Sequence, residues 1–321
     1  MPKDSQRLKI AALLGATATG KSRVAFEIAL SLGAEIVSVD SMQIYRGMDI
    51  GTAKPEPQWR RLVPHHMIDV ADASYDFSVA QFQVEARRAV EDIDARGKTA
   101  LLVGGTGLYF EAVVNDIRFP PGSADDALRR RLQRESVQDL EGLRQRLARL
   151  DPEFASGQDF ANPRRVVRAM EVYERTGIPF SSFQDRRGNH ASFYHFSGVV
   201  LNAPRAALYG VIDERVDKMF EAGLVEEVTG LASGPGLSRT ARQALGYKEV
   251  LDHLDTGISL EETIVNVKRR SRNYAKRQLT WLRRIPGLYW VELDEEDLVT
   301  PSNRILQAVR DHLQAGLQAG A

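Results

Sequence analysis

The sequence predicts an α/β protein, in which a parallel sheet carries helices on its faces and is interrupted by a helical insertion. Over the first 100 residues, short apolar runs rich in β-forming residues alternate with helical periods. The alternation stops at a Pro-Pro-Gly segment at residues 120–122, and a strand-like run returns at residue 193. Alternating strands and helices are typical of a parallel sheet, and the interruption indicates an inserted unit.

The first part of the chain contains four expected strands and two expected helices. The strands are the apolar runs at residues 8–14, 35–39, 66–70 and 99–103. The helices are expected at residues 21–32 and 78–95. In the second helix the apolar residues recur at helical spacing, as Val79, Phe82, Ala86 and Val90. Residues at this spacing share one face, so we expect this helix to pack on the sheet.

The middle of the chain is helical, and the strand pattern then resumes. From residue 120 to about 190, leucines recur at helical spacing, with breaks at Asp151-Pro152 and Asn162-Pro163. Later strands are expected at residues 193–201 and 288–293, and later helices at about 204–220, 261–285 and from 302 onward. We therefore predict a first core segment at residues 1–119, a helical insertion domain at 120–192 and a completion of the core at 193–321.

The composition is that of an ordinary globular protein. The chain has 321 residues, 43 Lys and Arg against 43 Asp and Glu, and no Cys. The balanced charge argues against a uniformly basic nucleic-acid binder, and the absence of Cys excludes thiol chemistry and a Cys-based zinc site. No run of about 18 apolar residues occurs, so we expect a cytoplasmic protein with neither a membrane span nor a signal peptide.

A phosphate-binding motif, G-x-x-x-x-G-K-[S/T], follows the first expected strand and precedes the first expected helix. It reads Gly15-Ala16-Thr17-Ala18-Thr19-Gly20-Lys21-Ser22. This strand–loop–helix context is the one that the motif requires. Backbone N–H groups at the helix N-terminus and the charge of Lys21 suit a di- or triphosphate, and the hydroxyl of Ser22 can reach Mg²⁺. The predicted fold class is therefore an α/β, P-loop NTPase-like parallel sheet.

Two further strand ends are expected beside the phosphate loop, because the carboxyl ends of parallel strands line one crevice. One of them carries Asp40, which is a magnesium ligand in one interpretation, a general base in a second and a turn cap in a third. The other carries Gly104, Gly105 and Thr106. Here the glycines permit a close approach of the backbone, and Thr106 offers a hydroxyl to the crevice.

Eight segments between residues 10 and 293 carry a family resemblance. They read GATATGKS (15–22), DSMQIYRGMDIGTAKP (40–55), HHMID (65–69), GGTGLY (104–109), NPRRVVRAMEV (162–172), LYGVIDERVDKMFEAGLVEEV (208–228), QALGYKE (243–249) and YAKRQLTWLRR (274–284). Together they resemble the tRNA dimethylallyltransferases, also called tRNA isopentenyltransferases. Eukaryotic relatives often carry a C-terminal zinc finger, which a chain without Cys cannot form, so the resemblance is to the bacterial type.

The resemblance implies an activity and its reacting groups. Members transfer a dimethylallyl group from dimethylallyl diphosphate to N6 of the adenine at tRNA position 37, beside the anticodon, which gives N6-isopentenyladenosine and diphosphate. By this resemblance the P-loop residues Gly15 to Ser22 and Arg215 bind the diphosphate, Asp40 is the base and Thr106 lies at the reacting centre. Mg²⁺, held at Ser22, is the implied cofactor, and a monomer without a membrane partner is expected.

The resemblance also implies which residues contact tRNA. They come from the strand ends, the insertion and the C-terminal part, and they are Asp40, Ser41, Met42, Gln43, Thr106, Arg164, Arg165, Val166, Val167, Arg168, Gln243, Gly246, Tyr247, Lys276, Arg277, Gln278, Trp281 and Arg283.

The composition of residues 268–284 predicts an RNA-binding face independently of the family resemblance. Residues 268–284 contain eight basic side chains and no acidic one. On a helix, Arg269, Arg272, Lys276 and Arg283 fall within one narrow stripe, and the apolar residues Val267, Tyr274, Trp281 and Ile285 lie on the other side. We therefore expect an apolar face that packs on the core and a basic face suited to tRNA phosphates.

One departure from the family pattern and two alternative functions remain to be considered. Many members of the family have a basic residue in the segment that here reads Leu208-Tyr209-Gly210-Val211-Ile212, so either Arg215 suffices or another cation substitutes. The main alternative function is a P-loop small-molecule kinase, which turns over ATP without tRNA. A third possibility is a non-catalytic RNA-binding NTPase, which binds tRNA without prenyl transfer.

Overall fold

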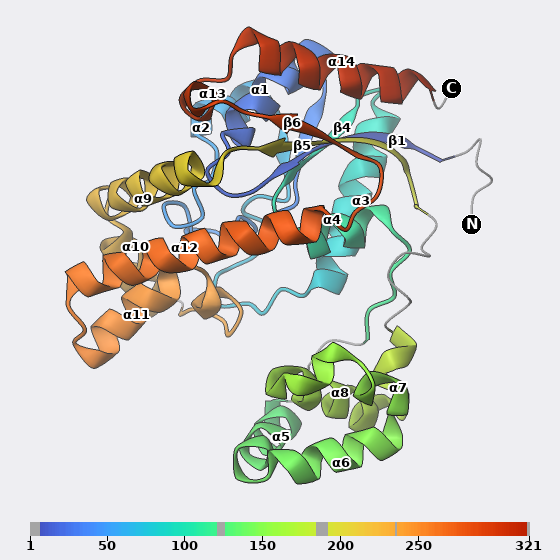
Figure 1. The fold of residues 1–321 in the computed structure, drawn as a ribbon, viewed down its shortest axis with the longest axis vertical. Coiled ribbons are helices and arrows are strands. Elements are labelled where there is room, and N and C mark those ends of the chain that lie inside the picture. Colours follow the sequence, from blue (N-terminus) through green and yellow to red (C-terminus); the bar gives the residue numbers. More distant parts are fainter. Residues whose placement is uncertain (1–6, 121–125, 184–191, 235, 320–321) are drawn as a thin grey trace. The chain divides into compact units, whose positions relative to one another are not determined.

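The computed structural model of the chain describes residues 7–120, 126–183, 192–234 and 236–319 (Figure 1). Contacts divide the chain into two compact units, of which the first is Met1–Val114 with Phe193–Ala321 and the second is Asn115–Ser192. The second unit is the helical insertion. It begins at Asn115 instead of residue 120 and ends at residue 192. Phe193 N donates to Val114 O at 2.6 Å, so the first unit is closed where the insertion leaves and rejoins it.

The first unit is built on the expected parallel sheet, which has six strands in the order β3-β2-β4-β1-β5-β6. The strands are β1 (Lys9–Gly15), β2 (Glu35–Ser38), β3 (His65–His66), β4 (Ala100–Gly104), β5 (His195–Asn202) and β6 (Leu288–Glu292). The expectation of a strand at residues 66–70 is wrong beyond His66. Met67 and Asp69 have positive φ angles of 63° and 58°, which no β-strand accommodates.

Helices cover both faces of this sheet, as the alternation of side chains along the strands requires (Figure 1). On β1, Leu13 belongs to the cluster of Val24 and Ile305, which come from α1 and α14. The next residue, Leu14, belongs to the cluster of Phe82 and Phe110, which come from α3 and α4. The sheet therefore separates two apolar cores, and neither of its faces is left uncovered by helices.

The helices of the first unit are α1 (Lys21–Leu32), α2 (Pro57–Leu62), α3 (Val79–Ala95), α4 (Gly107–Val114), α9 (Arg205–Glu221), α10 (Leu224–Ser233), α11 (Tyr247–Thr256), α12 (Leu260–Leu282), α13 (Glu295–Val299) and α14 (Asn303–Ala319). Helices α4, α10 and α11 differ from the sequence-based expectation, which has no helix at these places. Each is short and has a glycine at one or both ends, and glycine is a strong turn signal in a sequence.

The second unit contains α5 (Asp126–Gln138), α6 (Leu140–Leu150), α7 (Pro152–Ala155) and α8 (Pro163–Thr176). The breaks expected at the two Asp/Asn-Pro pairs are helix starts, where Asp151 and Asn162 are N-caps and the prolines occupy the first turn. Asp151 also accepts a hydrogen bond from Ser181 N at 2.8 Å. This unit has its own apolar core, which consists of Leu132, Leu143, Leu147, Phe154, Val166, Val167, Ala169, Met170, Val172 and Phe180.

Among the described residues, no helix is both long enough and apolar enough to span a bilayer.

The separate core of the second unit predicts a local effect of mutation. Leu147 is fully buried, so Leu147→Ala is expected to destabilise this unit by about 2–5 kcal/mol. Hydrogen exchange should show faster exchange of amides in α5, α6 and α8 and unchanged protection in β1 and β4, because no sheet residue belongs to this core. The control is Val137→Ala, since Val137 is 87% exposed. Equal loss of protection in β1 and β4 would contradict the division into two cores.

Candidate active site

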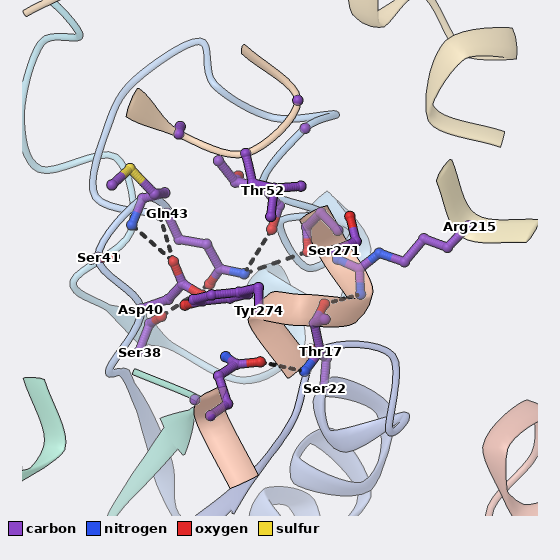
Figure 2. A pocket seen from close by; sticks show the side chains of 18 of the residues that line it. Thr17, Ser22, Ser38, Asp40, Ser41, Gln43, Thr52, Arg215, Ser271 and Tyr274 are labelled. Carbon is purple, nitrogen blue, oxygen red and sulfur yellow. Dashed lines mark hydrogen bonds between the residues drawn. The ribbon is translucent and has the colours of Figure 1, made fainter. Parts of the chain in front are cut away.

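A cavity of about 310 Å³ lies in the first unit at the carboxyl edge of the sheet (Figure 2). Its wall joins parts of the chain that are far apart in sequence. The phosphate loop, the segment after β2, helix α9, the segment before α11 and helix α12 all contribute, with side chains that include Thr17, Lys21, Ser22, Asp40, Ser41, Gln43, Ile212, Arg215, Met219, Gln243, Tyr274, Arg277 and Gln278. The ends of β1, β2 and β4 therefore share it, but after β4 the lining residues are Val103 and Gly104, and Thr106 is not among them.

The phosphate loop connects β1 to α1 and is held by its own hydrogen bonds. Thr19 Oγ1 and Lys21 Nζ both donate to Ala16 O, each at 2.9 Å. Gly20 and Ala18 have positive φ angles of 70° and 66°. A left-handed alanine is strained and persists only where its surroundings fix it. The chain itself therefore fixes the curved shape of the loop.

Two cations, Lys21 and Arg215, stand at the phosphate-loop end of the cavity, and no carboxylate of the described residues is bonded to either. Arg215 donates from Nη1 to Thr17 Oγ1 at 3.2 Å. Burial, and then the positive charge of Arg215, lower the pKa of Lys21 to about 8, although Asp40 partly offsets this. Burial also lowers the pKa of Arg215, again with a partial offset from Asp40. Both groups are therefore poorly compensated, and an anion between them would relieve their repulsion.

Asp40 stands at the other end of the cavity and keeps one oxygen available. Its Oδ1 accepts hydrogen bonds from the N–H groups of Met42 at 2.8 Å and Gln43 at 3.3 Å. Within the described residues, Oδ2 accepts no hydrogen bond. The turn-cap interpretation of Asp40 is therefore correct for one oxygen, and the second oxygen remains free to accept a proton.

The side-chain amide of Gln43 is hydrogen-bonded to other residues of the protein. Its Nε2 donates to the carbonyl oxygens of Thr52 at 3.3 Å and Ala53 at 3.4 Å. Its Oε1 accepts from Ser38 Oγ at 2.9 Å. Gln43 lines the cavity. These bonds make its amide part of the wall, with its orientation set by the backbone.

The inner face of α12 contacts both strand-end loops. Gln278 Oε1 accepts a hydrogen bond from Thr17 N at 2.9 Å, and Tyr274 OH lies 3.4 Å from Thr106 Oγ1. One turn further along, Trp281 Nε1 donates to Glu111 Oε2 at 2.5 Å. Burial, and then the charge of Asp40, raise the pKa of Tyr274 to about 12, so its hydroxyl keeps its proton at neutral pH.

Two glycines after β4 allow this approach of α12. A Cβ atom on Gly105 would lie 2.3 Å from Gln278 Nε2, and one on Gly107 would lie 2.0 Å from Trp281 Cδ1. Both distances are far inside van der Waals contact. The sequence-based expectation of a close approach at Gly104 and Gly105 is right: a Cβ atom would lie 2.6 Å from Val39 O at Gly104 and 2.6 Å from Gly15 O at Gly105. The approach of α12 at Gly105 and Gly107 adds to these backbone contacts.

The residues expected to contact tRNA fall into two groups. Arg164 is exposed on α8, whereas Val166 and Val167 are 0% and 4% exposed in the core of the second unit. Tyr247 and Gln278 are 0% and 5% exposed in the first unit. That these residues contact tRNA stays a prediction: Val166, Val167 and Tyr247 pack inside their own units, whereas Gln278 lines the cavity. Gln243 is exposed, Arg165 is partly exposed, and Arg168 is partly buried and pairs with Glu171 at 3.1 Å.

The basic charges of α12 divide into two halves. In the first half, Lys268 pairs with Asp217 at 2.7 Å, Arg272 with Asp213 at 2.6 Å and Arg270 with the buried Glu249. These pairs correct the expectation that Arg272 belongs to an uncompensated basic face. Arg269 is the exception in this half: it is exposed and donates to Asn266 Oδ1 at 2.8 Å. In the second half no carboxylate of the described residues pairs with the exposed side chains, which are Lys276, Arg277, Arg283 and Arg284. Of these four, Lys276, Arg277 and Arg284 line a surface groove together with Asn273, Thr280 and Trp281.

The face by which α12 packs also differs from the expected one. Its buried residues are Thr263, Val267, Ser271, Ala275, Gln278 and Leu282. Most of these are small or polar, so a search for apolar residues alone identifies only part of the face. Tyr274 and Trp281 lie beside it and are partly buried.

The donor set of the cavity fits Mg²⁺ held mainly by a bound diphosphate. Within the described residues there is no cluster of three or more His, Asp or Glu side chains that could hold a metal alone. Mg²⁺ in phosphate sites usually keeps several waters and takes one or two protein oxygens. The Ser22 hydroxyl on the cavity wall supplies such an oxygen, and Oδ2 of Asp40 is left for a proton.

Comparison with known proteins decides the family. The sequence profile described as IPP transferase matches residues 43–285, and that described as isopentenyl transferase matches residues 8–62. The chain belongs to the IPP transferase family. It is 46% identical over 300 residues to the tRNA dimethylallyltransferase of Moorella thermoacetica, which covers 92% of this chain and 93% of the relative. The enzyme of the same name from Desulforudis audaxviator is 48% identical over 287 residues, with coverage of 88% and 91%.

Solved structures of this family have the same fold. The tRNA isopentenylpyrophosphate transferase of Bacillus halodurans matches with a TM-score of 0.72 and 37% identity over 97% of each chain. A eukaryotic dimethylallyltransferase acting on tRNA matches with a TM-score of 0.77 and 29% identity over 94% of this chain and 77% of that chain. The P-loop NTPase-like fold and the prenyltransferase class expected from the sequence are thus confirmed, and the family uses a divalent metal.

Several residues of this IPP transferase site carry no motif signal of their own. Ile212, Val216 and Met219 of α9 form an apolar wall beside Arg215. Their recurrence at helical spacing around Arg215 is the one sequence signal that could have found them. Val211, by contrast, packs against the core cluster of α1 and α14. Two further cations line the cavity, of which Arg270 is paired with Glu249 and Arg277 has no carboxylate partner among the described residues.

The lowered pKa of Lys21 predicts how diphosphate binding depends on pH. A bound diphosphate favours the protonated ammonium, so the pKa of Lys21 is higher in the complex than the value of about 8 in the free protein. Affinity is therefore expected to be greatest below about pH 8 and to fall as the pH rises from that value towards the pKa of the complex, by at most about tenfold per pH unit.

Calorimetric titration with inorganic diphosphate from about pH 6.5 to about pH 9.5 measures this dependence. Lys21→Met is the control, because it retains only the ionisation of the ligand and of other groups. If the two proteins show the same pH dependence, Lys21 does not meet the diphosphate.

Proposed function

We propose that this protein transfers a dimethylallyl group from dimethylallyl diphosphate to the exocyclic N6 of the adenine at tRNA position 37, and that the described cavity is the site of this reaction. The observation that carries the proposal is that a phosphate loop with two poorly compensated cations and a carboxylate with one free oxygen line the same cavity. Transfer of a dimethylallyl group from a diphosphate to an amine needs cations for the leaving group and a proton acceptor for the amine.

The cation-rich end suits the leaving group. As the allylic C–O bond breaks, its electron pair goes to the diphosphate oxygen, and negative charge accumulates on the leaving group. The N–H groups of the phosphate loop, Lys21 and Arg215 are positioned before the reaction to compensate this charge. The apolar wall of Ile212, Val216 and Met219 gives the five-carbon chain a surface without water.

The carboxylate end suits the nucleophile. The lone pair of the adenine amine is delocalised into the ring, so removal of one N6 proton while the N–C bond forms lowers the barrier. The free Oδ2 of Asp40 accepts this proton, while Oδ1 stays bonded to the backbone. Thr106 and Tyr274 offer two hydroxyls beside this end. The adenine reaches them only after leaving its stack in the anticodon loop.

Mg²⁺ would be held at Ser22 and by the diphosphate itself, and would neutralise charge on the diphosphate oxygens. A tRNA substrate also agrees with a cytoplasmic location and with a monomer that binds one anticodon stem-loop. The exposed cations of the second half of α12 and the arginines of α8 are the surfaces that we assign to tRNA phosphates.

A direct assay tests the proposal. The protein is incubated with Mg²⁺, labelled dimethylallyl diphosphate and an anticodon stem-loop that has adenine at position 37. Label is expected in the RNA, and none is expected in a stem-loop with guanine at that position. ATP hydrolysis in the absence of RNA, without transfer of label, would instead favour the kinase alternative.

The role of Asp40 predicts the effect of one isosteric change. Asp40→Asn keeps the Oδ1 acceptor for the Met42 and Gln43 amides but replaces the free oxygen with an amide that cannot take a proton. We expect the single-turnover rate to fall by roughly 10²–10⁴-fold, with little change in the affinity for diphosphate or RNA. Asp72→Asn, at an exposed surface pair, is the control. A near-normal rate would leave Asp40 as a turn residue.

The divided charges of α12 predict which basic residues bind RNA. Changing Lys276, Arg277 and Arg283 together to Gln should weaken stem-loop binding and make its salt slope shallower by about one to three units, because counterion release scales with phosphate contacts. Removing equal charge at the exposed Arg88, Arg239 and Arg310 is the control. Fluorescence titrations across a salt series measure both slopes, and a wild-type slope in the first variant would show that this half of α12 does not touch RNA.

A further inference from the structure

Glu227 on α10 accepts four hydrogen bonds from residues that lie near the cavity. Three come from consecutive backbone N–H groups, of Asp49 at 2.9 Å, Ile50 at 2.8 Å and Gly51 at 3.4 Å. The fourth comes from Tyr247 OH at 2.5 Å. Burial, and then the charge of Glu227, raise the pKa of Tyr247, so this hydroxyl keeps its proton and donates. Three amides converging on one carboxylate form a strong, charge-assisted anchor.

The anchored segment leads directly to the reacting carboxylate. Ala53 follows the three amides, and its N–H donates to Ile50 O at 3.0 Å. The carbonyl oxygens of Thr52 and Ala53 hold the side-chain amide of Gln43, whose backbone N–H is bonded to Asp40 Oδ1. Ala53 has a positive φ of 46°, a strained conformation that only a well-fixed segment retains.

The packing around this anchor is as specific as its hydrogen bonds. A Cβ atom on Gly51 would lie 2.4 Å from Cε2 of the Tyr247 ring, so glycine is needed for the ring to reach Glu227. Lys54 also fixes this part of the chain, but its partners, Tyr45 O, Asp49 and Asp69, all belong to the same N-terminal region. Glu227 is different, because it ties the segment to α10, the helix that directly follows the Arg215 helix α9.

From these contacts we infer that Glu227 is a positioning residue for the reaction, which holds the Asp40 carboxylate at a fixed place relative to Arg215. The inference rests on the proposed function of Asp40. In its terms, Glu227 sets the separation between the proton acceptor and the leaving-group end of the cavity, and it touches neither substrate. Small displacements of a reacting group lower rates strongly, so the loss of this anchor affects the chemical step.

The test is a double-mutant cycle in single-turnover prenyl transfer. Glu227→Gln keeps the shape of the side chain but removes its charge and presents an N–H to the amides. We expect the rate to fall by about 10- to 100-fold, while the affinity for inorganic diphosphate stays within about twofold, because the phosphate loop has its own hydrogen bonds. In an Asp40→Asn background the same change should cost less than about threefold, because residues that act through one another are not additive.

Two further variants and one measurement without turnover make the test decisive. Tyr247→Phe removes one donor and keeps the ring against Gly51, so a smaller loss with the same non-additivity is expected. Glu226→Gln, at the exposed neighbouring residue, should change nothing. Hydrogen exchange should become faster at residues 49–51 in Glu227→Gln and stay unchanged in the phosphate loop.

Equal losses in the wild-type and Asp40→Asn backgrounds, or unchanged exchange at residues 49–51, would overturn the inference. Absence of any prenyl transfer by the wild-type protein would overturn the proposed function instead, so the two failures are distinguishable.

Discussion

The close approach of α12 to the ends of β1 and β4 is the constraint on which the rest of the site depends. Gly105 and Gly107 leave no room for a side chain, and the space is filled by Gln278 and Trp281. The bond between Gln278 and the Thr17 amide then joins the helix to the phosphate loop, and Tyr274 joins it to Thr106. One helix face thereby touches both ends of the cavity. A side chain at Gly105 would meet the Gln278 amide and the Gly15 carbonyl oxygen, and one at Gly107 would meet the Trp281 ring, so these contacts would have to shift.

Helix α12 packs on the core and also carries many basic side chains. Where it packs against α9 and α11, most of these side chains form ion pairs with the two helices. Lys268, Arg270 and Arg272 each meet a carboxylate of α9 or α11, so their charges are compensated within the protein. Partly exposed pairs of this kind contribute only about 0–1 kcal/mol each, so their main effect is on orientation and charge distribution. On α12, the charges without a carboxylate partner among the described residues are those of Arg269 and of the second half of the helix, where Arg277 lines both the groove and the cavity.

Local patterns in the sequence were enough for most of the sheet, for the phosphate loop and for marking which strand ends lie beside it. Alternation and motif spacing are short-range properties, and they identify Lys21, Asp40 and Thr106 from their neighbours alone. The contacts that position these groups are long-range. Gln278 is 261 residues from Thr17, and Glu227 is 178 residues from Asp49. No periodicity encodes such pairs, and a stripe of arginines does not reveal which members face carboxylates of other helices.

The two halves of the first unit contribute differently to the site. Residues before the insertion supply the groups that we assign to the chemistry, namely the phosphate loop, Asp40 and Thr106, whereas helices after it supply the partners that hold them. Arg215 is the exception, since it lies on α9 and bonds to Thr17 directly. The segments before and after the insertion contact each other throughout the site. The insertion therefore has to leave and rejoin the first unit at neighbouring residues. The hydrogen bond from Phe193 N to Val114 O provides this closure, because it joins the last residue before the insertion to the first residue after it.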